Sequence, residues 1–458
     1  MMSKQTRRCC NSKPPAATTP IKSLHVVLGK TTDLRSLTHE YRHHTSYLVE
    51  ELFIEPSCSY SFGLAPTVSE PDWDRHLTEA RRLFRALGDF PQLKKIHIKC
   101  LGASGCGFPL ELLTALLINP MREMYLQELV LEQCQFSSQD DYDHDRTDLV
   151  LAVRFLNNLK RLECDERAFR FPGAGGMWEE DDQDVQDRHG GCCNAQFIQT
   201  IMELPRLQDL KFAAPHNSSV CKLDSAALET FVTSSRSLSL KNFQLDSSSL
   251  AALAMAMESP ACCLDSLDLD ISHAWAAVND LFQAFASNTS LTNLELWVSD
   301  MASWKEHQCS IVLANALVQN THLKSLKLRG LKPFSEDSIA AFCKILEAND
   351  TLTEIELFGA SGERLAPAIE FYTTLNAKDG GRKQKLQDMS NYSMSQWMQV
   401  LGDTNTRTSR MTDDGGMHNL EGLYFWLRRN PSVITSVDSS SSSQENVSKN
   451  DELIYVDC

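Results

Sequence analysis

The stretch "NTSLTNLELW" at residues 288–297 returns with small changes as "NTHLKSLKLR" at 320–329 and as "NDTLTEIELF" at 349–358. Successive copies begin 32 and 29 residues apart. A nearly constant period of this length is typical of repeat proteins, in which each copy forms one unit that stacks on the next. The copies therefore predict a stacked array rather than one ordinary compact domain.

Alignment of the copies on their leucines gives the frame L-x-x-L-x-L. The frame fits eleven segments, among them "LQELVL" at 126–131 and "LDSLDL" at 264–269. The other segments begin at residues 21, 49, 93, 159, 207, 240, 291, 323 and 352. Cys134 follows the "LQELVL" copy at the position where a repeat of this frame takes Asn or Cys.

Helix-forming stretches separate the copies, at 247–259, 310–320 and 338–349. Their apolar residues recur with the spacing i, i+3, i+4, i+7, as in Ile339, Phe342, Cys343 and Leu346. This spacing places the apolar side chains on one side of a helix. Each unit is therefore predicted to be a short strand, a turn and a helix.

Asparagine recurs where these helices are expected to end, at Asn288, Asn320 and Asn349. This position suits the C-terminus of a helix, where Asn tolerates the left-handed conformation. Asn288 and Asn349 also begin N-x-S/T sequons. We favour the helix-ending role, because the chain shows no secretory signal.

Repeats of 24–33 residues with a strand and a full helix resemble the ribonuclease-inhibitor-type leucine-rich repeat (LRR) family. The resemblance covers residues 90–375, and more loosely 21–375. It implies an α/β solenoid, a horseshoe with a parallel sheet on the concave side and helices outside. Insertions near 57–75 and 165–193 interrupt the period.

The region after the last repeat contains "FYTTLNAKDGGRKQKL", "SQWMQVL" and "LEGLYFWLRRNPSVI". It resembles a C-terminal segment of intracellular LRR proteins of some protists. Residues 376–431 are expected to form a helical cap, because the last repeat of an array would otherwise expose its core side. Residues 1–20 and 432–458 are too polar to pack and are expected to be disordered.

The composition, 42% hydrophobic and 23% charged, is that of a soluble protein with a core. A net charge of −16 argues against nucleic-acid or anionic-membrane binding, which needs clustered cations. The fifteen cysteines show neither a disulfide framework nor zinc spacing, so reduced thiols are expected. The chain lacks a run of ~20 apolar residues that could span a membrane. We expect a cytoplasmic location, with the nucleus or an organelle left open because Asp33 is the first acidic residue.

Sites for chemistry are poorly supported. The segment 141–152 opens like a calcium loop, but Arg146 replaces the turn glycine and Ala152 replaces the bidentate Glu. His189 lies near Cys192 and Cys193, a spacing that suits a tetrahedral metal poorly. The chain lacks a phosphate-binding glycine loop and a serine-nucleophile motif. We therefore expect no cofactor, no metal and no enzymatic activity.

The frame also indicates where a partner would bind. Its leucines face the core, the residues between them face solvent, and equal positions in successive repeats stack about 4.8 Å apart. The position after the frame is occupied by Asp270, Trp297, Arg329 and Phe358, and an aromatic–arginine column is typical of a binding hot spot. The charged neighbours Asp268, Glu295, Lys327 and Glu356 complete the predicted partner-binding set. The alternative is that Trp297 and Phe358 turn inward and only pack.

We therefore predict a non-catalytic scaffold that binds an unknown protein partner on its concave side and is a monomer outside its complexes. Some repeats present positive residues on their strands, as in "KKIHIKC", and others present negative residues, as in "DSLDLD". A surface with both signs favours a protein partner over a polyanion. Two other functions stay open. One is regulation of a small GTPase, since Ran GTPase-activating proteins share the repeat type, although they would carry a strongly acidic tail. The other is substrate recognition for ubiquitin ligation, which would need a recruiting helix pair near the N-terminus.

Overall fold

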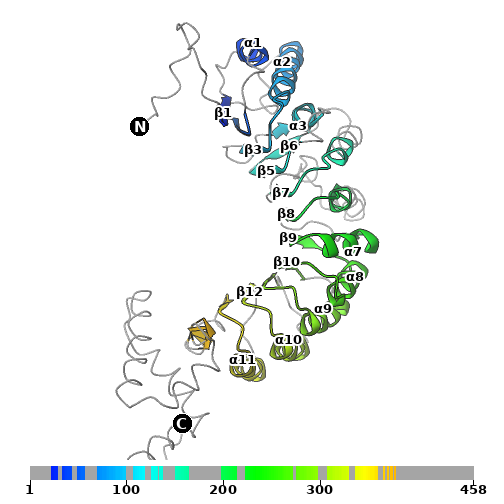
Figure 1. The fold of residues 1–458 in the computed structure, drawn as a ribbon, viewed down its shortest axis with the longest axis vertical. Helices are drawn as coiled ribbons and strands as arrows, with labels where there is room; N and C mark the ends of the chain where they lie inside the picture. Colours follow the sequence, from blue (N-terminus) through cyan, green and yellow to red (C-terminus); the bar gives the residue numbers. More distant parts are fainter. Residues whose placement is uncertain are drawn as a thin grey trace, which may run out of the picture. The chain divides into compact units, whose positions relative to one another are not determined.

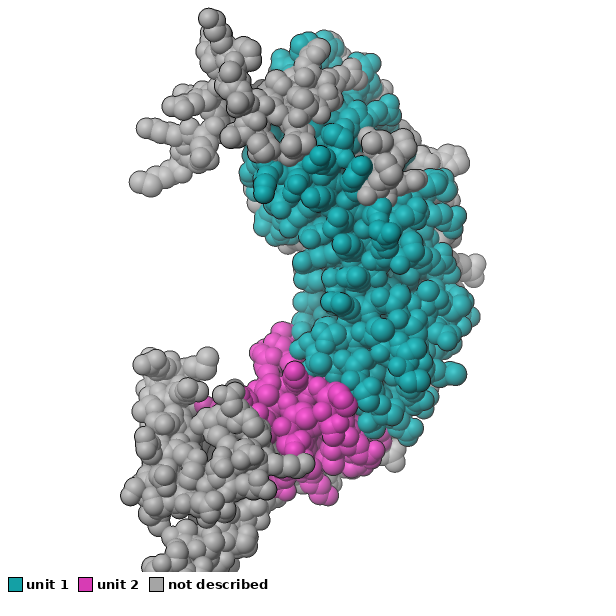
Figure 2. Space-filling model, viewed as in Figure 1, with its two compact units in different colours: residues 1–301 teal, residues 302–458 magenta. Residues whose placement is uncertain are grey.

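The structure is a computed structural model of the 458-residue chain. It describes residues 22–28, 34–43, 49–56, 70–99, 107–118, 125–132, 134–137, 150–164, 197–213, 222–271, 275–297, 307–329, 336–358 and most of 365–377. The chain divides into two compact units, Met1–Met301 and Ala302–Cys458 (Figure 2). Several expected segments lie outside the described residues: the N-terminus 1–20, residues 57–69 and 165–193 of the insertions, the cap from 378 onward and the tail 432–458.

In unit 1, parallel strands follow one another in chain order (Figure 1). They are β1 (Ser23–Leu28), β2 (Glu51–Pro56), β3 (Lys95–Lys99), β5 (Glu128–Glu132), β7 (Arg161–Cys164), β8 (Asp209–Ala213), β9 (Ser237–Gln244), β10 (Ser266–Asp270) and β11 (Asn293–Trp297). The labelled helices between them are α1 (Leu34–His43), α2 (Glu70–Gly88), α3 (Leu110–Leu117), α7 (Ser225–Ser234), α8 (Ser247–Glu258) and α9 (Trp275–Ser287). The short strands β4 (Gly107–Pro109) and β6 (Gln135–Ser137) pair separately. Residues 70–75 of the expected first insertion belong to α2.

Unit 2 repeats the same alternation. It contains α10 (His307–Gln319), β12 (Ser325–Arg329), α11 (Glu336–Ala348) and β13 (Glu354–Leu357), and β12 and β13 are parallel. The described part of the chain thus has eleven consecutive parallel strands, as many as the predicted copies. The predicted fold class, an α/β solenoid of repeated strand–helix units, is confirmed.

Burial alternates along the strands as the frame requires. In β10, Leu267 and Leu269 are buried, whereas Ser266 and Asp268 are half-buried. In unit 1 the strands lie along one side and the helices along the other (Figure 1). The frame leucines therefore pack against the helices, and the intervening residues occupy the opposite side of the sheet.

The expected frame copy at 240–245 is wrong. In the observed register Leu238 and Leu240 of β9 pair with Leu210 and Phe212 of β8, so this copy begins at Ser235. Ser235 is fully buried where the frame has leucine, and its Oγ donates to the carbonyl of Leu207 at 2.7 Å. Phe243 and Leu245 are buried as well, which is why the frame also fits five residues later.

The prediction that Asn ends the helices is confirmed. α9, α10 and α11 end at the residue before Asn288, Asn320 and Asn349, and each of these N–H groups donates to the carbonyl four residues earlier. All three residues are 3% exposed. Each Oδ1 accepts from the N–H groups two and three residues later, at 2.7–3.0 Å. The side chain therefore closes the turn into the next strand.

The same side chains bind the preceding repeat. Nδ2 of Asn288 donates to the Met257 carbonyl at 2.8 Å, which also leaves this sequon nitrogen buried and engaged. Cys134 occupies a different position, after β5, and it also bonds to the preceding repeat, since its Sγ donates to the Ile98 carbonyl at 3.5 Å. Buried polar side chains thus join one repeat to the next.

Candidate protein-binding face

The candidate site is the side of the strands that faces away from the helices, which we call the sheet face. Its middle positions align strand by strand, and we call this alignment the central row. In unit 1 the central row is His25, Phe53, His97, Val130, Glu163, Lys211, Ser239, Asp268 and Glu295. In unit 2 it is Lys327 and Glu356. The predicted stacking of equal positions is thus confirmed within each unit.

Four predicted binding residues lie together in unit 1. Asp268 pairs in register with Glu295, and Asp270 pairs with Trp297. The Lys241 Nζ atom lies 4.4 Å from the centroid of the Trp297 ring.

Asp270 was expected to face solvent, but this expectation is wrong: the residue is only 8% exposed. Strand β10 lies between β9 and β11, so the Lys241 side chain must pass over β10 to reach the indole of Trp297. The register shift between Leu269 and Asp270 accompanies this arrangement.

The other four predicted residues lie together in unit 2. Lys327 Nζ contacts Glu356 at 3.1 Å and Glu354 at 3.3 Å. The Arg329 guanidinium carbon lies 4.2 Å from the Phe358 ring centroid. Phe358 is 41% exposed, so it does not turn inward, and the predicted aromatic–arginine contact exists here as a stacked pair.

Ion pairs connect neighbouring strands along the face. Glu163 accepts from Lys211 and Arg161, both at 2.7 Å. Burial acts to raise the pKa of Glu163, but the hydrogen bonds and the positive charges of Lys211 and Arg161 together outweigh it and hold the pKa below its ordinary value. The face therefore carries a pattern of paired charges, and not merely a net sign.

Two other glutamates of the face behave similarly. A hydrogen bond from Lys99 at 2.5 Å lowers the pKa of Glu132, and a hydrogen bond from His97 at 3.2 Å lowers this pKa further. The Ser325 hydroxyl donates to Glu354 at 2.5 Å and lowers the pKa of that carboxyl group. These carboxylates stay ionised at neutral pH and are held in place by their donors.

A second group on the face was missed from the sequence. The rings of His25 and Phe53 lie 6.2 Å apart at 76°, and those of Phe53 and His97 lie 5.5 Å apart at 58°. We call these three residues the His–Phe strip. Its signal was the aromatic or imidazole residue between the two apolar residues of "LHV", "LFI" and "IHI", where most other copies have a charged or small residue.

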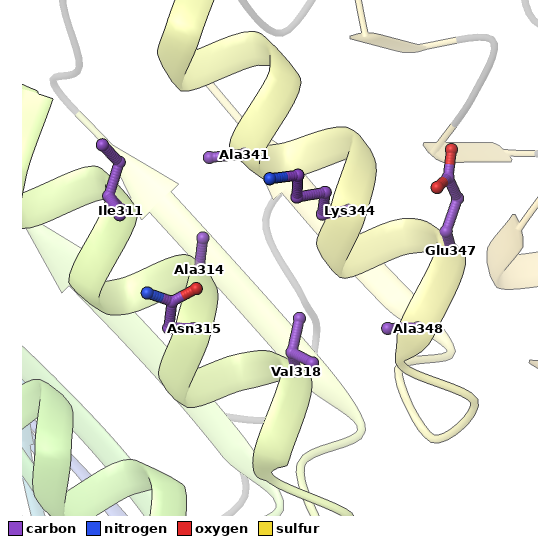
Figure 3. A pocket seen from close by; sticks show the side chains of 8 residues that line it. All are labelled: Ile311, Ala314, Asn315, Val318, Ala341, Lys344, Glu347 and Ala348. Carbon is purple, nitrogen blue, oxygen red and sulfur yellow. The ribbon is translucent and has the colours of Figure 1, made fainter.

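The helix side of unit 2 carries a groove of about 710 Å³ between α10 and α11 (Figure 3). Ile311, Ala314, Asn315 and Val318 line it from α10, and Ala341, Lys344, Glu347 and Ala348 line it from α11. The small alanines leave room between the helices, and Ile311 and Val318 are 39% and 37% exposed. The groove offers apolar surface, whereas the sheet face offers aligned charged and aromatic groups that give direction to a contact.

Among the described residues, no cluster of three or more His, Cys, Asp or Glu side chains could hold a metal ion, and no helix could cross a membrane. The segments weighed as metal sites, 141–152 and 189–193, lie outside the described residues, apart from 150–152. Five described cysteines are free thiols: Cys134, Cys164, Cys262, Cys263 and Cys343.

Comparison with models of known protein families gives no match for this chain, and a search of curated proteins gives none either.

Proposed function

We propose that this chain is an LRR protein of the ribonuclease-inhibitor type that acts as a non-catalytic scaffold and binds a partner protein on its sheet face. Support for the LRR assignment comes from the repeated frame, the eleven parallel strands, the buried Asn residues that follow α9, α10 and α11, and the buried Cys134 after β5. A rigid repeat array presents an extended surface of aligned side chains, and such surfaces commonly bind other macromolecules.

The observation that carries the proposal is the contact of the half-buried Arg329 with the exposed ring of Phe358. Arginine and aromatic side chains supply much of the energy of protein interfaces, because they bury large areas and make directional contacts. The guanidinium is already held over the ring, so binding would order few additional groups. The ion pairs of Lys327 beside it would select a partner by its charge pattern.

Affinity capture from a cell lysate tests this function with two matched variants. The sheet-face variant is Glu295→Lys/Arg329→Glu/Phe358→Asp, and the helix-face variant is Glu258→Lys/Lys344→Glu/Met255→Asp. Each variant reverses one negative charge, reverses one positive charge and replaces one apolar side chain by aspartate. Met255 suits the control because it is 75% exposed. Circular dichroism establishes that both variants fold.

We expect one stoichiometric partner to bind the intact protein and the helix-face variant equally. The amount of this partner captured by the sheet-face variant should be lower by at least roughly tenfold. Loss of the partner from the helix-face variant alone would assign binding to the helix side of the repeats. Equal binding by all three proteins would refute a role for the sheet face.

A further inference from the structure

The N-terminal end of the sheet face combines aromatic rings with surplus negative charge. Around the His–Phe strip, the face of β1, β2, β3 and β5 carries four glutamates against two lysines: Glu51, Glu55, Glu128 and Glu132, and Lys95 and Lys99. Lys95 pairs with Glu128 at 3.5 Å and Lys99 with Glu132 at 2.5 Å. His25 Nε2 lies 3.1 Å from Glu55. Within the described residues no cation pairs with Glu51, so the surplus lies beside β1.

The segment that precedes β1 has the opposite charge. Residues 1–22 contain five cations, Lys4, Arg7, Arg8, Lys13 and Lys22, and the chain has no acidic residue before Asp33. The chain enters the sheet next to the glutamates, because the Lys22 carbonyl accepts from the N–H groups of Glu50 and Glu51, both at 3.0 Å. A cationic segment is therefore attached beside the surplus carboxylate.

The segment that precedes β1 is long enough to reach across the four strands of the His–Phe strip and its glutamates. From Arg8 to Lys22 an extended chain can span roughly 45 Å at about 3.3 Å per residue. Four neighbouring strands about 4.8 Å apart extend over only about 14 Å. Pro14, Pro15 and Pro20 favour extended backbone in the residues before them, which preserves that reach.

We propose that residues 4–13 of this chain lie over its own His–Phe strip, with the guanidinium groups of Arg7 and Arg8 on the rings and paired with Glu51 and Glu55. A guanidinium is planar and weakly hydrated, so it can stack on an aromatic ring while it donates to a carboxylate. The N-terminal end of the sheet face is then occupied by the chain itself. This contact requires no external partner, so it stands or falls independently of the function proposed above.

Zero-length carbodiimide cross-linking of the full chain, read by mass spectrometry of the separated monomer and dimer fractions, tests the contact. The reagent joins the amine of Lys4 or Lys13 to a carboxylate only when the two groups touch. The Lys95–Glu128 pair serves as an internal standard for reaction yield. Two variants are compared with the intact chain: Arg7→Ser/Arg8→Ser removes the guanidinium groups, and Arg7→Lys/Arg8→Lys keeps the charge without the planar group. Neither variant removes a cross-linking lysine.

We expect cross-links from Lys4 or Lys13 to Glu51, Glu55, Glu128 or Glu132. Their yield should fall roughly fivefold or more in the serine variant and by less in the lysine variant. Three results would overturn the proposal. The first is absence of these cross-links while the Lys95–Glu128 standard forms, and the second is an equal yield of cross-links to helix-face carboxylates such as Glu229 and Glu258. The third is restriction of the cross-links to a dimer fraction, which would assign the strip to a second copy of the chain.

Discussion

Nδ2 of Asn349 donates to the carbonyl oxygen of Asn320 at 2.9 Å, so two asparagines at the same position of successive repeats are joined directly. The same nitrogen donates to the Leu317 carbonyl at 2.7 Å, and Oδ1 accepts from the N–H of Leu352 at 2.8 Å. Asn376 continues the series through its own bond to the Asn349 carbonyl at 3.2 Å. The period seen in the sequence is thus the period of a buried hydrogen-bonded ladder.

Replacement of Asn349 by alanine should destabilise unit 2. The substitution leaves buried main-chain carbonyl and N–H groups without their partners, which costs about 2–3 kcal/mol. Asn315→Ala on the exposed face of α10 is the matched control and should change the free energy of unfolding by less than about 0.5 kcal/mol. Urea denaturation measures both variants. Similar midpoints for the two would contradict a structural role for the ladder.

Stability should depend on the ionisation of Glu163. Its pKa is lowered in the folded state, so its stabilising contribution is complete above the unfolded value of 4.5 and is lost as the pH falls through the folded pKa. Glu163→Gln should cost about 1 kcal/mol at pH 7, and this difference should shrink below pH 4.5. Urea denaturation at several pH values follows it. In an Arg161→Met/Lys211→Met background Glu163 should no longer be more stabilising than Gln, because only the cost of burying the carboxylate remains. Persistence of the stabilisation in that background would assign the effect to another cause.

Phe358→Ala should separate binding from stability. The ring is 41% exposed and its stacking on Arg329 is a surface cation–π contact, so the free energy of unfolding should change by less than about 1 kcal/mol. Partner affinity should fall about tenfold or more, because exposed aromatic residues of this kind anchor interfaces. Thermal denaturation and titration of the captured partner give the two quantities. A large loss of stability with unchanged affinity would show that Phe358 only packs.

The last strand, β13, should require residues after 377 to bury its apolar side chains. Ile355 and Leu357 of β13 are half-buried, whereas Leu326 and Leu328 of β12 are 0% and 2% exposed. We therefore expect a chain that ends at residue 377 to melt at lower temperature and to aggregate, because its last strand exposes apolar side chains and open hydrogen-bonding groups. A chain that ends at residue 431 loses only the Ser-rich tail and should melt like the full chain. Equal melting of both truncated chains would argue against a cap in 378–431.

Most of the fold could be predicted from the sequence, because the frame recurs often enough that one misplaced copy leaves the fold class unchanged. α8 was expected at 247–259 and is observed at Ser247–Glu258. α10 and α11 begin a few residues before the expected positions, because their first turns contain polar residues that carry no apolar period. The copy at Ser235 was misplaced because a hydrogen-bonded serine occupies the position of a leucine.

The candidate site could be predicted only in part. The sequence indicates which residues share the sheet face, and the pair Arg329 and Phe358 lies there as expected. It could not indicate that Asp270 is buried, because Asp270 lies at a register shift against β9 that the regular frame does not predict. The His–Phe strip was missed because its members come from three different strands and none is unusual alone.

Carboxyl footprinting of the isolated complex tests most directly whether the sheet face binds the partner. Free protein and complex are labelled with a carbodiimide and a small amine, and the extent of labelling at each residue is measured by mass spectrometry. We predict that labelling of Glu295 and Glu356 falls roughly threefold or more in the complex, because an interface excludes the reagent, while Glu229 and Glu258 on the helices keep their labelling. Unchanged labelling of Glu295 and Glu356, with protection at the helix residues instead, would contradict the account.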